Sequence, residues 1–148
     1  MIAVDTNLLV YAHMEEVTHH QSALHALAGL AGGRRRWGVP WPCIHEFLAV
    51  VTNSRIYSRA SPMSEALAAV GDLRAARGAA FLGESADHLE ILGDLLQRGS
   101  IIGPRVHDAR IAAICLGHGV DELWTAGRDF SYFPELRTRN PLVGNSQA

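Results

Sequence analysis

Lysine is absent from the sequence: all 13 basic residues of this 148-residue chain are arginine. The absence excludes mechanisms that depend on a lysine, including Schiff-base chemistry and phosphate binding by a P-loop. Cysteine is scarce, with only Cys43 and Cys115 present. Both lie among apolar residues with helical periodicity, so we expect buried free thiols rather than a disulfide.

Long hydrophobic runs are also lacking. No uninterrupted apolar stretch approaches the roughly 18 residues that a membrane span needs. The first residues carry Asp5 within their apolar stretch and no basic segment, so they do not read as a signal peptide. We therefore expect a single domain over residues 1–148, located in the cytoplasm, with no membrane partner.

The net charge of −2 does not by itself indicate nucleic-acid binding. Local basic features are nevertheless present, namely the triplet Arg34, Arg35 and Arg36 and, late in the chain, Arg128. Because phosphate binding depends on local charge, these four residues are candidate contacts for RNA phosphates. A solvated loop is the alternative interpretation of the triplet.

Short apolar runs alternate with segments of helical periodicity along the whole chain. This alternation predicts an α/β domain with a parallel sheet covered on both faces. We expect strands at 2–4, 37–39, 79–82 and 120–125, a short fifth strand within 136–142, and helices at about 18–30, 42–52, 61–73, 86–97 and 106–116.

Two acidic residues follow predicted strands. Asp5 comes directly after the first strand and Asp129 a few residues after the fourth. Ligands of open parallel sheets bind outside the carboxyl ends of the strands, so both carboxylates are candidates for a functional crevice. Alternatively, Asp5 closes a turn or caps a helix, and Asp129 caps the short segment after it.

Two further acids lie on predicted helices. Asp108 stands at the start of a buried stripe, because apolar residues follow it at i+3, i+4 and i+7. A buried carboxylate without a partner is costly, although the helix N-terminus can stabilise it. Glu46 flanks the apolar stripe of its own helix, where a functional carboxylate and a solvated one are both compatible with the pattern.

Convergence of these acids would require a cation. Two carboxylates about 5–6 Å apart repel by roughly 3 kcal/mol at an effective dielectric near 20. A hard divalent ion relieves this repulsion, and Mg²⁺ prefers oxygen ligands and keeps several waters. Histidine-rich ligation would favour zinc, but His19, His20 and His25 are expected on the polar side of one helix.

Four segments, spread over almost the whole chain, resemble the motifs of PIN-domain ribonucleases, most closely the VapC-like toxins of type II toxin–antitoxin systems. They are residues 4–12, residues 45–47, residues 107–113, and residues 125–130 with 133–137 and 140–142.

The resemblance implies a three-layer α/β/α sandwich with a central, mainly parallel sheet of four to five strands. It also implies a metal-dependent endoribonuclease that hydrolyses RNA, uses Mg²⁺ or Mn²⁺, is inhibited by a small antitoxin protein and usually forms a homodimer. Asp5, Glu46, Asp108 and Asp129 would then bind the metal and act in catalysis. Asn7 and Thr125 would orient these carboxylates and their waters.

The fourth motif departs from the family pattern at Gly127. Family members commonly read Asp-x-Asp-Phe there, and only Asp129 of that pair remains. Asp129 is therefore the fourth metal ligand, directly or through water, or metal binding at this position is weakened. In the second case the alternative function is a catalytically weakened RNA-binding module. Two other protein classes fit the sequence less well. Phosphatases of the haloacid-dehalogenase type need a second Asp where this chain has Asn7, and response-regulator receivers need a lysine, which this chain lacks.

Overall fold

The computed structural model describes residues 1–143 of the chain. Within those residues the chain forms six α-helices, one 3₁₀ helix and five strands. In order along the chain they are β1 (Ile2–Val4), α1 (Thr6–His13), α2 (His20–Gly32), β2 (Trp37–Pro40), α3 (Trp41–Val51), α4 (Met63–Ala75), β3 (Ala79–Leu82), α5 (His88–Arg98), α6 (Arg105–Gly117), β4 (Glu122–Trp124), the 3₁₀ helix η1 (Asp129–Tyr132) and β5 (Thr138–Arg139).

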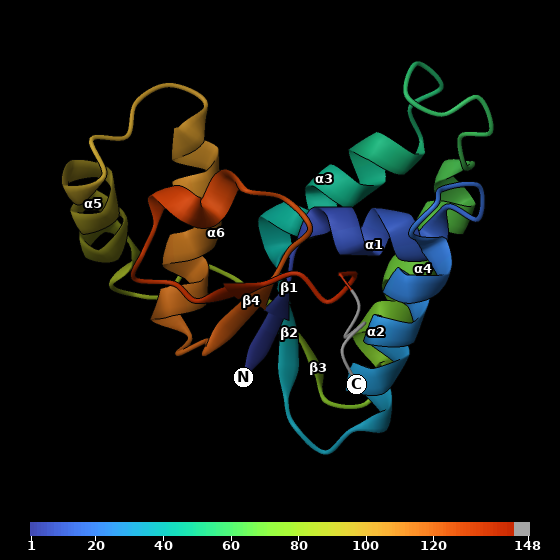
Figure 1. Cartoon of the computed structure of the whole chain (residues 1–148), viewed down its shortest axis with the longest axis horizontal. Coiled ribbons are helices and arrows are strands. Elements are labelled where there is room, and N and C mark those ends of the chain that lie inside the picture. Colours follow the sequence, from blue (N-terminus) through green and yellow to red (C-terminus); the bar gives the residue numbers. More distant parts are fainter. Residues whose placement is uncertain (144–148) are drawn as a thin grey trace.

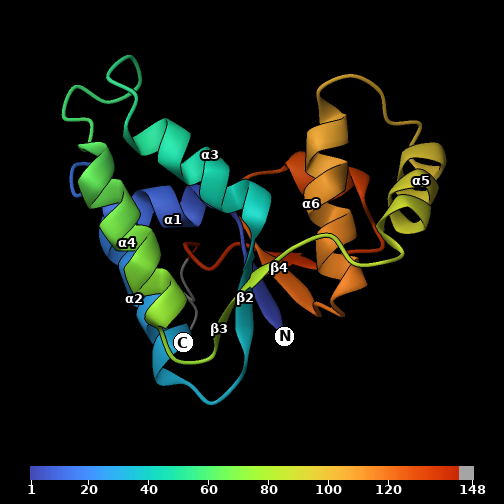
Figure 2. The same ribbon diagram turned by 180° about the vertical axis from the view of Figure 1, so that it is seen from behind.

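The five strands form one sheet in the order β3-β2-β1-β4-β5, and every pair of neighbours is parallel. Helices α2 and α4 lie on one side of this sheet and α5 and α6 on the other (Figures 1 and 2). The arrangement is the expected three-layer α/β/α sandwich, with its parallel sheet of five strands. None of the helices within residues 1–143 is long and apolar enough to cross a membrane.

Small residues allow the layers to approach closely. Ala109, Ala112 and Ala113 of α6 are completely buried in the core, where their short side chains let the helix lie near the sheet. On β2, a Cβ atom at Gly38 would lie 2.8 Å from Cδ1 of Leu82 on the neighbouring strand β3. Glycine at this position therefore permits the packing between β2 and β3.

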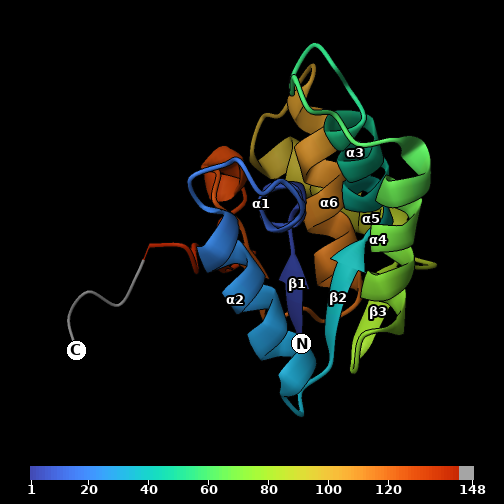
Figure 3. The ribbon, with the colours of Figure 1, turned by 90° about the vertical axis from the view of Figure 1, so that its right-hand side faces the viewer.

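Strands β1 and β2 run side by side toward the same edge of the sheet, where α1 and α3 begin (Figure 3). Asp5 lies at this edge as the N-terminal cap of α1, and its Oδ1 accepts a hydrogen bond from the Thr6 amide at 2.8 Å. A carboxylate is among the preferred groups at such a cap. The connection from β1 to α1 therefore fixes the first acid of the candidate site.

The expected elements are present, but one helix was not predicted. Helix α1 covers a segment in which Leu8, Leu9 and Val10 are consecutive and all buried, so the segment shows no helical periodicity. The expected fifth strand is confirmed only as the two-residue β5.

Candidate functional site

A cavity of about 250 Å³ lies at the carboxyl edge of the sheet. All four predicted acids line it, and each comes from a different element: Asp5 from the end of β1, Glu46 from α3, Asp108 from α6 and Asp129 from η1. The fold thus gathers four carboxylates that are remote in sequence around one cavity, which we call the acidic pocket.

Asp5 is the most buried of the four acids, with 8% of its surface exposed. Its Oδ2 accepts a hydrogen bond from the Thr125 hydroxyl at 2.8 Å, and the Cys43 thiol lies 3.6 Å from its Oδ1. Burial raises the pKa of Asp5 above its ordinary value of 3.8, whereas the hydrogen bonds oppose that rise. Both oxygens of this carboxylate therefore have a fixed orientation before any ion binds.

Thr6 connects two of the acids. Its amide donates to Asp5, and its hydroxyl donates to Oε2 of Glu46 at 3.0 Å. Glu46 is exposed, so this hydrogen bond is what restrains an otherwise free side chain at the pocket. One feature of the sequence points to this role: Thr6 directly follows the candidate acid Asp5.

Asp108 is the acid whose pKa is raised by the charges of all three other acids. Burial raises its pKa above 3.8, and the negative charges of Asp129, Asp5 and Glu46 raise it further, in that order of size. No residue within 1–143 donates a hydrogen bond to its carboxylate. A half-buried carboxylate without donors, facing three other acids, has the surroundings of a cation ligand.

The loop after β4 is tied to α1 by the two predicted polar residues. Asn7 accepts a hydrogen bond from the Ala126 amide at 3.2 Å, and the Gly127 amide donates to the Thr125 hydroxyl at 3.1 Å. A Cβ atom built at Gly127 would lie 3.4 Å from Nδ2 of Asn7 and 3.8 Å from Oδ2 of Asp129, which are ordinary contacts. The departure from the family motif therefore leaves space next to Asp129.

The four carboxylates suit a divalent ion that keeps part of its water shell better than an ion bound by protein ligands alone. No three His, Cys, Asp or Glu residues in the described part of the chain are arranged so that they hold an ion by themselves. Mg²⁺ commonly takes only one or two protein carboxylates and completes its shell with water. An oxygen-only set around a cavity of about 250 Å³ fits that mode.

The pocket also contains residues that the sequence did not suggest. Tyr11 of α1 and Tyr57, from the loop between α3 and α4, line it together with Ile111 and Phe130. Burial raises the pKa of Tyr57 above 10.0, so this hydroxyl stays protonated at neutral pH. No periodicity marks a loop tyrosine as part of a site, and therefore Tyr57 could not be found without the fold.

The basic candidates divide into two groups. Arg34, Arg35 and Arg36 lie between α2 and β2, at the amino end of the strands, and Arg35 faces Asp121 at 3.5 Å. That end of the sheet is opposite the acidic pocket, so the triplet does not line the pocket, and its contact with RNA phosphates stays a prediction. Arg128 directly precedes η1 and is exposed next to Asp129, and it remains beside the pocket.

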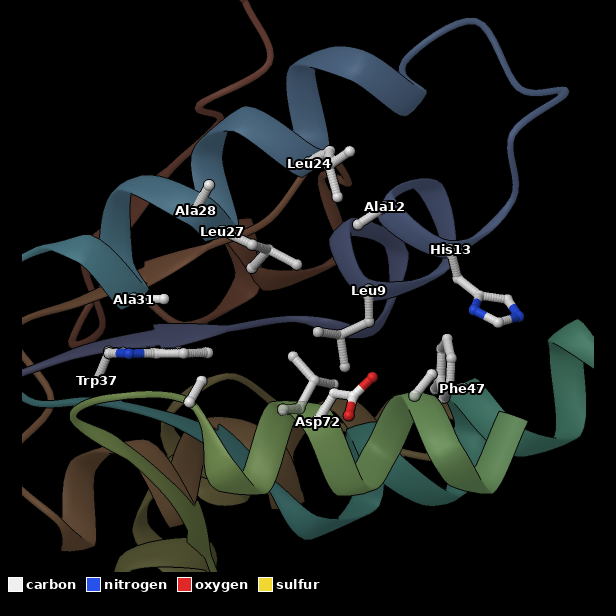
Figure 4. A pocket seen from close by; sticks show the side chains of 13 residues that line it. Leu9, Ala12, His13, Leu24, Leu27, Ala28, Ala31, Trp37, Phe47 and Asp72 are labelled. Carbon is white, nitrogen blue, oxygen red and sulfur yellow. The ribbon is translucent and has the colours of Figure 1, made fainter. Parts of the chain in front are cut away.

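A second cavity, of about 360 Å³, lies between α2 and α4. Leu24 and Leu27 of α2 face it from one side and Asp72 of α4 from the other, with Trp37 at one end (Figure 4). Its lining is mostly apolar and contains no cluster of acids. The chemistry of the molecule is therefore concentrated at the acidic pocket.

Comparison with known proteins shows the family to which the chain belongs. The family model described as PIN domain matches residues 2–136, so the chain belongs to the PIN domain family. Among curated relatives, Ribonuclease VapC43 of Mycobacterium tuberculosis is 33% identical over 146 residues, covering 99% of both chains. Ribonuclease VapC37 of the same organism is 29% identical, covering 95% of this chain and 97% of its own.

Solved structures show the same fold. VapBC2 from Rickettsia felis, bound to a DNA fragment from its promoter, matches with a TM-score of 0.68 and 23% identity, covering 95% of this chain and 98% of that one. VapC20 of Mycobacterium tuberculosis, described as a Sarcin-Ricin loop cleaving toxin, matches with a TM-score of 0.65 and 18% identity. The match covers 88% of this chain and 93% of that one.

Proposed function

We propose that this protein is a divalent-metal-dependent endoribonuclease and the toxin component of a type II toxin–antitoxin pair. The observation that carries the proposal is the acidic pocket, in which Asp5, Glu46, Asp108 and Asp129 converge from four elements. The chain's membership of the PIN domain family and its curated relatives, which are named VapC ribonucleases, support the same activity.

Asp5 and Asp108 would hold Mg²⁺ or Mn²⁺, and Glu46 and Asp129 would bind its waters or a second ion. When bound, the ion lowers the pKa of water and neutralises charge that develops on the phosphate. Glu46 or Asp129 accepts the proton of the attacking water. The water oxygen forms the new bond to phosphorus, the bond to the leaving ribose oxygen breaks, and solvent supplies the proton to that oxygen.

The remaining residues of the pocket would keep this arrangement in place. Thr6 orients Glu46, Thr125 orients Asp5, and Asn7 holds the loop after β4 close to α1. Such outer contacts commonly change metal affinity or activity by about 10- to 100-fold when they are removed. Arg128 would contact a phosphate of the bound RNA.

A small antitoxin protein would cover the acidic pocket and inhibit the enzyme. The structural neighbours support this partner, since they include complexes named VapBC and a toxin–antitoxin complex from Klebsiella pneumoniae. We further propose that residues 1–148 act as one domain in the cytoplasm and form a homodimer.

The test is RNA cleavage by the purified protein with Mg²⁺, compared among wild type, Asp108→Asn and Asp72→Asn. Asp72 is an exposed acid on α4 outside the acidic pocket, so it serves as the control. We expect cleavage by wild type and the control, a loss of at least about 100-fold in Asp108→Asn, and no products after chelation. Metal-independent RNA binding without products would instead assign the non-catalytic module that the glycine at position 127 suggests.

A further inference from the structure

Beside the acidic pocket, an arginine and a tyrosine are stacked on each other at the surface. The guanidinium carbon of Arg105 lies 3.6 Å from the centroid of the Tyr132 ring. Arg105 is the first residue of α6 and Tyr132 the last residue of η1, and both are exposed, with 42% of Tyr132 accessible. We call these two residues the Arg105–Tyr132 pair.

The pair is one turn away from two of the pocket's acids. Arg105 precedes Asp108 by three residues on α6, so their side chains lie on neighbouring sides of the helix about 4.5 Å apart along its axis. Tyr132 follows Asp129 by three residues in a 3₁₀ helix, where residues at i and i+3 eclipse each other. Helix α6 and η1 therefore present the acids and the stacked pair side by side.

The guanidinium of Arg105 lacks an acidic partner among residues 1–143, unlike Arg98 and Arg110, which pair with Asp94 and Glu84. Its hydrogen-bond donors remain available while its plane rests on an aromatic ring. Planar guanidinium groups and aromatic rings are the surfaces on which unpaired RNA bases stack, and guanidinium donors bind phosphate. A cation here also offsets the repulsion between the acids and the RNA backbone.

We propose that the Arg105–Tyr132 pair binds unpaired RNA next to the scissile phosphate, with a base stacked on the pair and a neighbouring phosphate bound by Arg105. This inference rests on the proposed ribonuclease activity and assigns a substrate-binding role to two residues outside the acidic motifs. A purely structural role, in which the pair fastens η1 to α6, predicts altered thermal stability and no specific effect on RNA affinity.

Two measurements separate these roles. The first is the affinity for a fluorescein-labelled pool of random-sequence single-stranded RNA, measured by anisotropy in the inactive Asp108→Asn background. We expect Arg105→Ala and Tyr132→Ala to weaken binding by roughly 5- to 50-fold, and Tyr132→Phe, which keeps the ring, to bind within about twofold of its parent. Arg98→Ala is the matched control, because Arg98 is an exposed arginine at the end of α5 that does not line the pocket, and this variant should bind RNA unchanged.

The second measurement is the steady-state cleavage of RNA by otherwise active protein. Arg105→Ala should raise KM by a similar factor while kcat changes less than about threefold, because the acids are untouched. RNA affinity and KM that remain unchanged in both alanine variants would overturn the inference, as would a fall in kcat alone. Lost co-purification with a co-expressed antitoxin at unchanged RNA affinity would assign the pair to a protein contact and also overturn it.

Failure of the proposed function looks different from failure of this inference. A wild-type protein that cleaves no RNA refutes the ribonuclease assignment whatever the pair does. Cleavage that depends on Asp108 but not on Arg105 or Tyr132 preserves the ribonuclease and refutes only the role of the pair.

Discussion

Replacing Asp108 by asparagine should make the metal-free protein more stable while weakening its stabilisation by metal. Two unit charges roughly 8 Å apart repel by about 2 kcal/mol at an effective dielectric of 20 and by about 0.5 kcal/mol in bulk water. Asp108 faces three such charges, and two of them, on Glu46 and Asp129, are exposed and well screened.

The favourable contribution of the helix N-terminus partly offsets this repulsion. Asp108 is in the first turn of α6, where a negative charge is stabilised by about 0.3–1 kcal/mol. The expected net gain for Asp108→Asn is therefore about 1–2 kcal/mol, or roughly 3–8 °C in Tm, at pH 7 in the presence of a chelator. Added Mg²⁺ should then stabilise wild type more than the variant.

The gain should also depend on pH in a definite direction. The folded-state pKa of Asp108 is raised above 3.8, so the folded protein binds the proton more tightly than the unfolded chain, and its stability falls as pH rises through this range. The advantage of Asp108→Asn is therefore present at neutral pH and disappears as pH falls toward 3.8. Thermal melts at several pH values in chelator measure this dependence.

Glu90→Gln is the matched control, because Glu90 is an exposed acid in the first turn of α5 with no acidic pocket beside it. The Glu90→Gln variant should lose the favourable interaction between this charge and the N-terminus of α5, so its Tm should be slightly lower than that of wild type. If Asp108→Asn also melts lower in chelator at pH 7, or gains equally at pH 3.5 and pH 7, the reasoning about repulsion in the acidic pocket is refuted.

Three further predictions concern the surroundings of the pocket. Thr6→Ala should lower kcat by about 10-fold because Glu46 loses its hydrogen bond, and Thr6→Ser, which keeps the hydroxyl, should retain the wild-type kcat. Equal kcat values for wild type and both variants would refute the role of Thr6. Gly127→Asp should fold normally and bind Mg²⁺ about fivefold more tightly by calorimetry, whereas unchanged affinity would show that position 127 does not face the ion. Cys43 and Cys115 should react with a thiol reagent at pH 8 only after the protein unfolds. Burial raises the pKa of both thiols, that of Cys115 to about 12. Fast labelling of the native protein would contradict their burial.

Much of the fold could be predicted because strands and helices alternate with distinct periodicities. Helix α1 could not, since Leu8, Leu9 and Val10 are all buried, and a segment that is apolar on every side carries no periodic signal. Thr6 and Asn7 are polar residues between two apolar runs, a pattern that does not by itself predict a helix. In the structure these residues form the first turn of the helix that Asp5 caps.

Three acids of the candidate site could be selected from the residue pattern, because Asp5 and Asp129 follow strands and Asp108 replaces an apolar residue of a buried stripe, whereas Glu46 depended on the family resemblance. The parallel sheet brings Asp5 and Asp129 to one edge, because all its strands end there, and the packing of α3 and α6 adds Glu46 and Asp108. The roles of Thr6 and Tyr57 depend on contacts between distant segments, which local patterns do not contain. Charge alone also did not reveal at which end of the sheet the loop with Arg34, Arg35 and Arg36 lies.

The most direct test of the central claim is calorimetric titration of the metal-free protein with Mn²⁺, comparing wild type with Asp5→Asn. Asp5 is buried and held by Thr6 and Thr125, so its amide replacement keeps the shape of the pocket and removes one charge. We predict saturable binding by wild type and at least about 10-fold weaker binding by the variant. A wild type that binds no Mn²⁺, or a folded variant that binds it equally well, would contradict the claim that these carboxylates form a metal site.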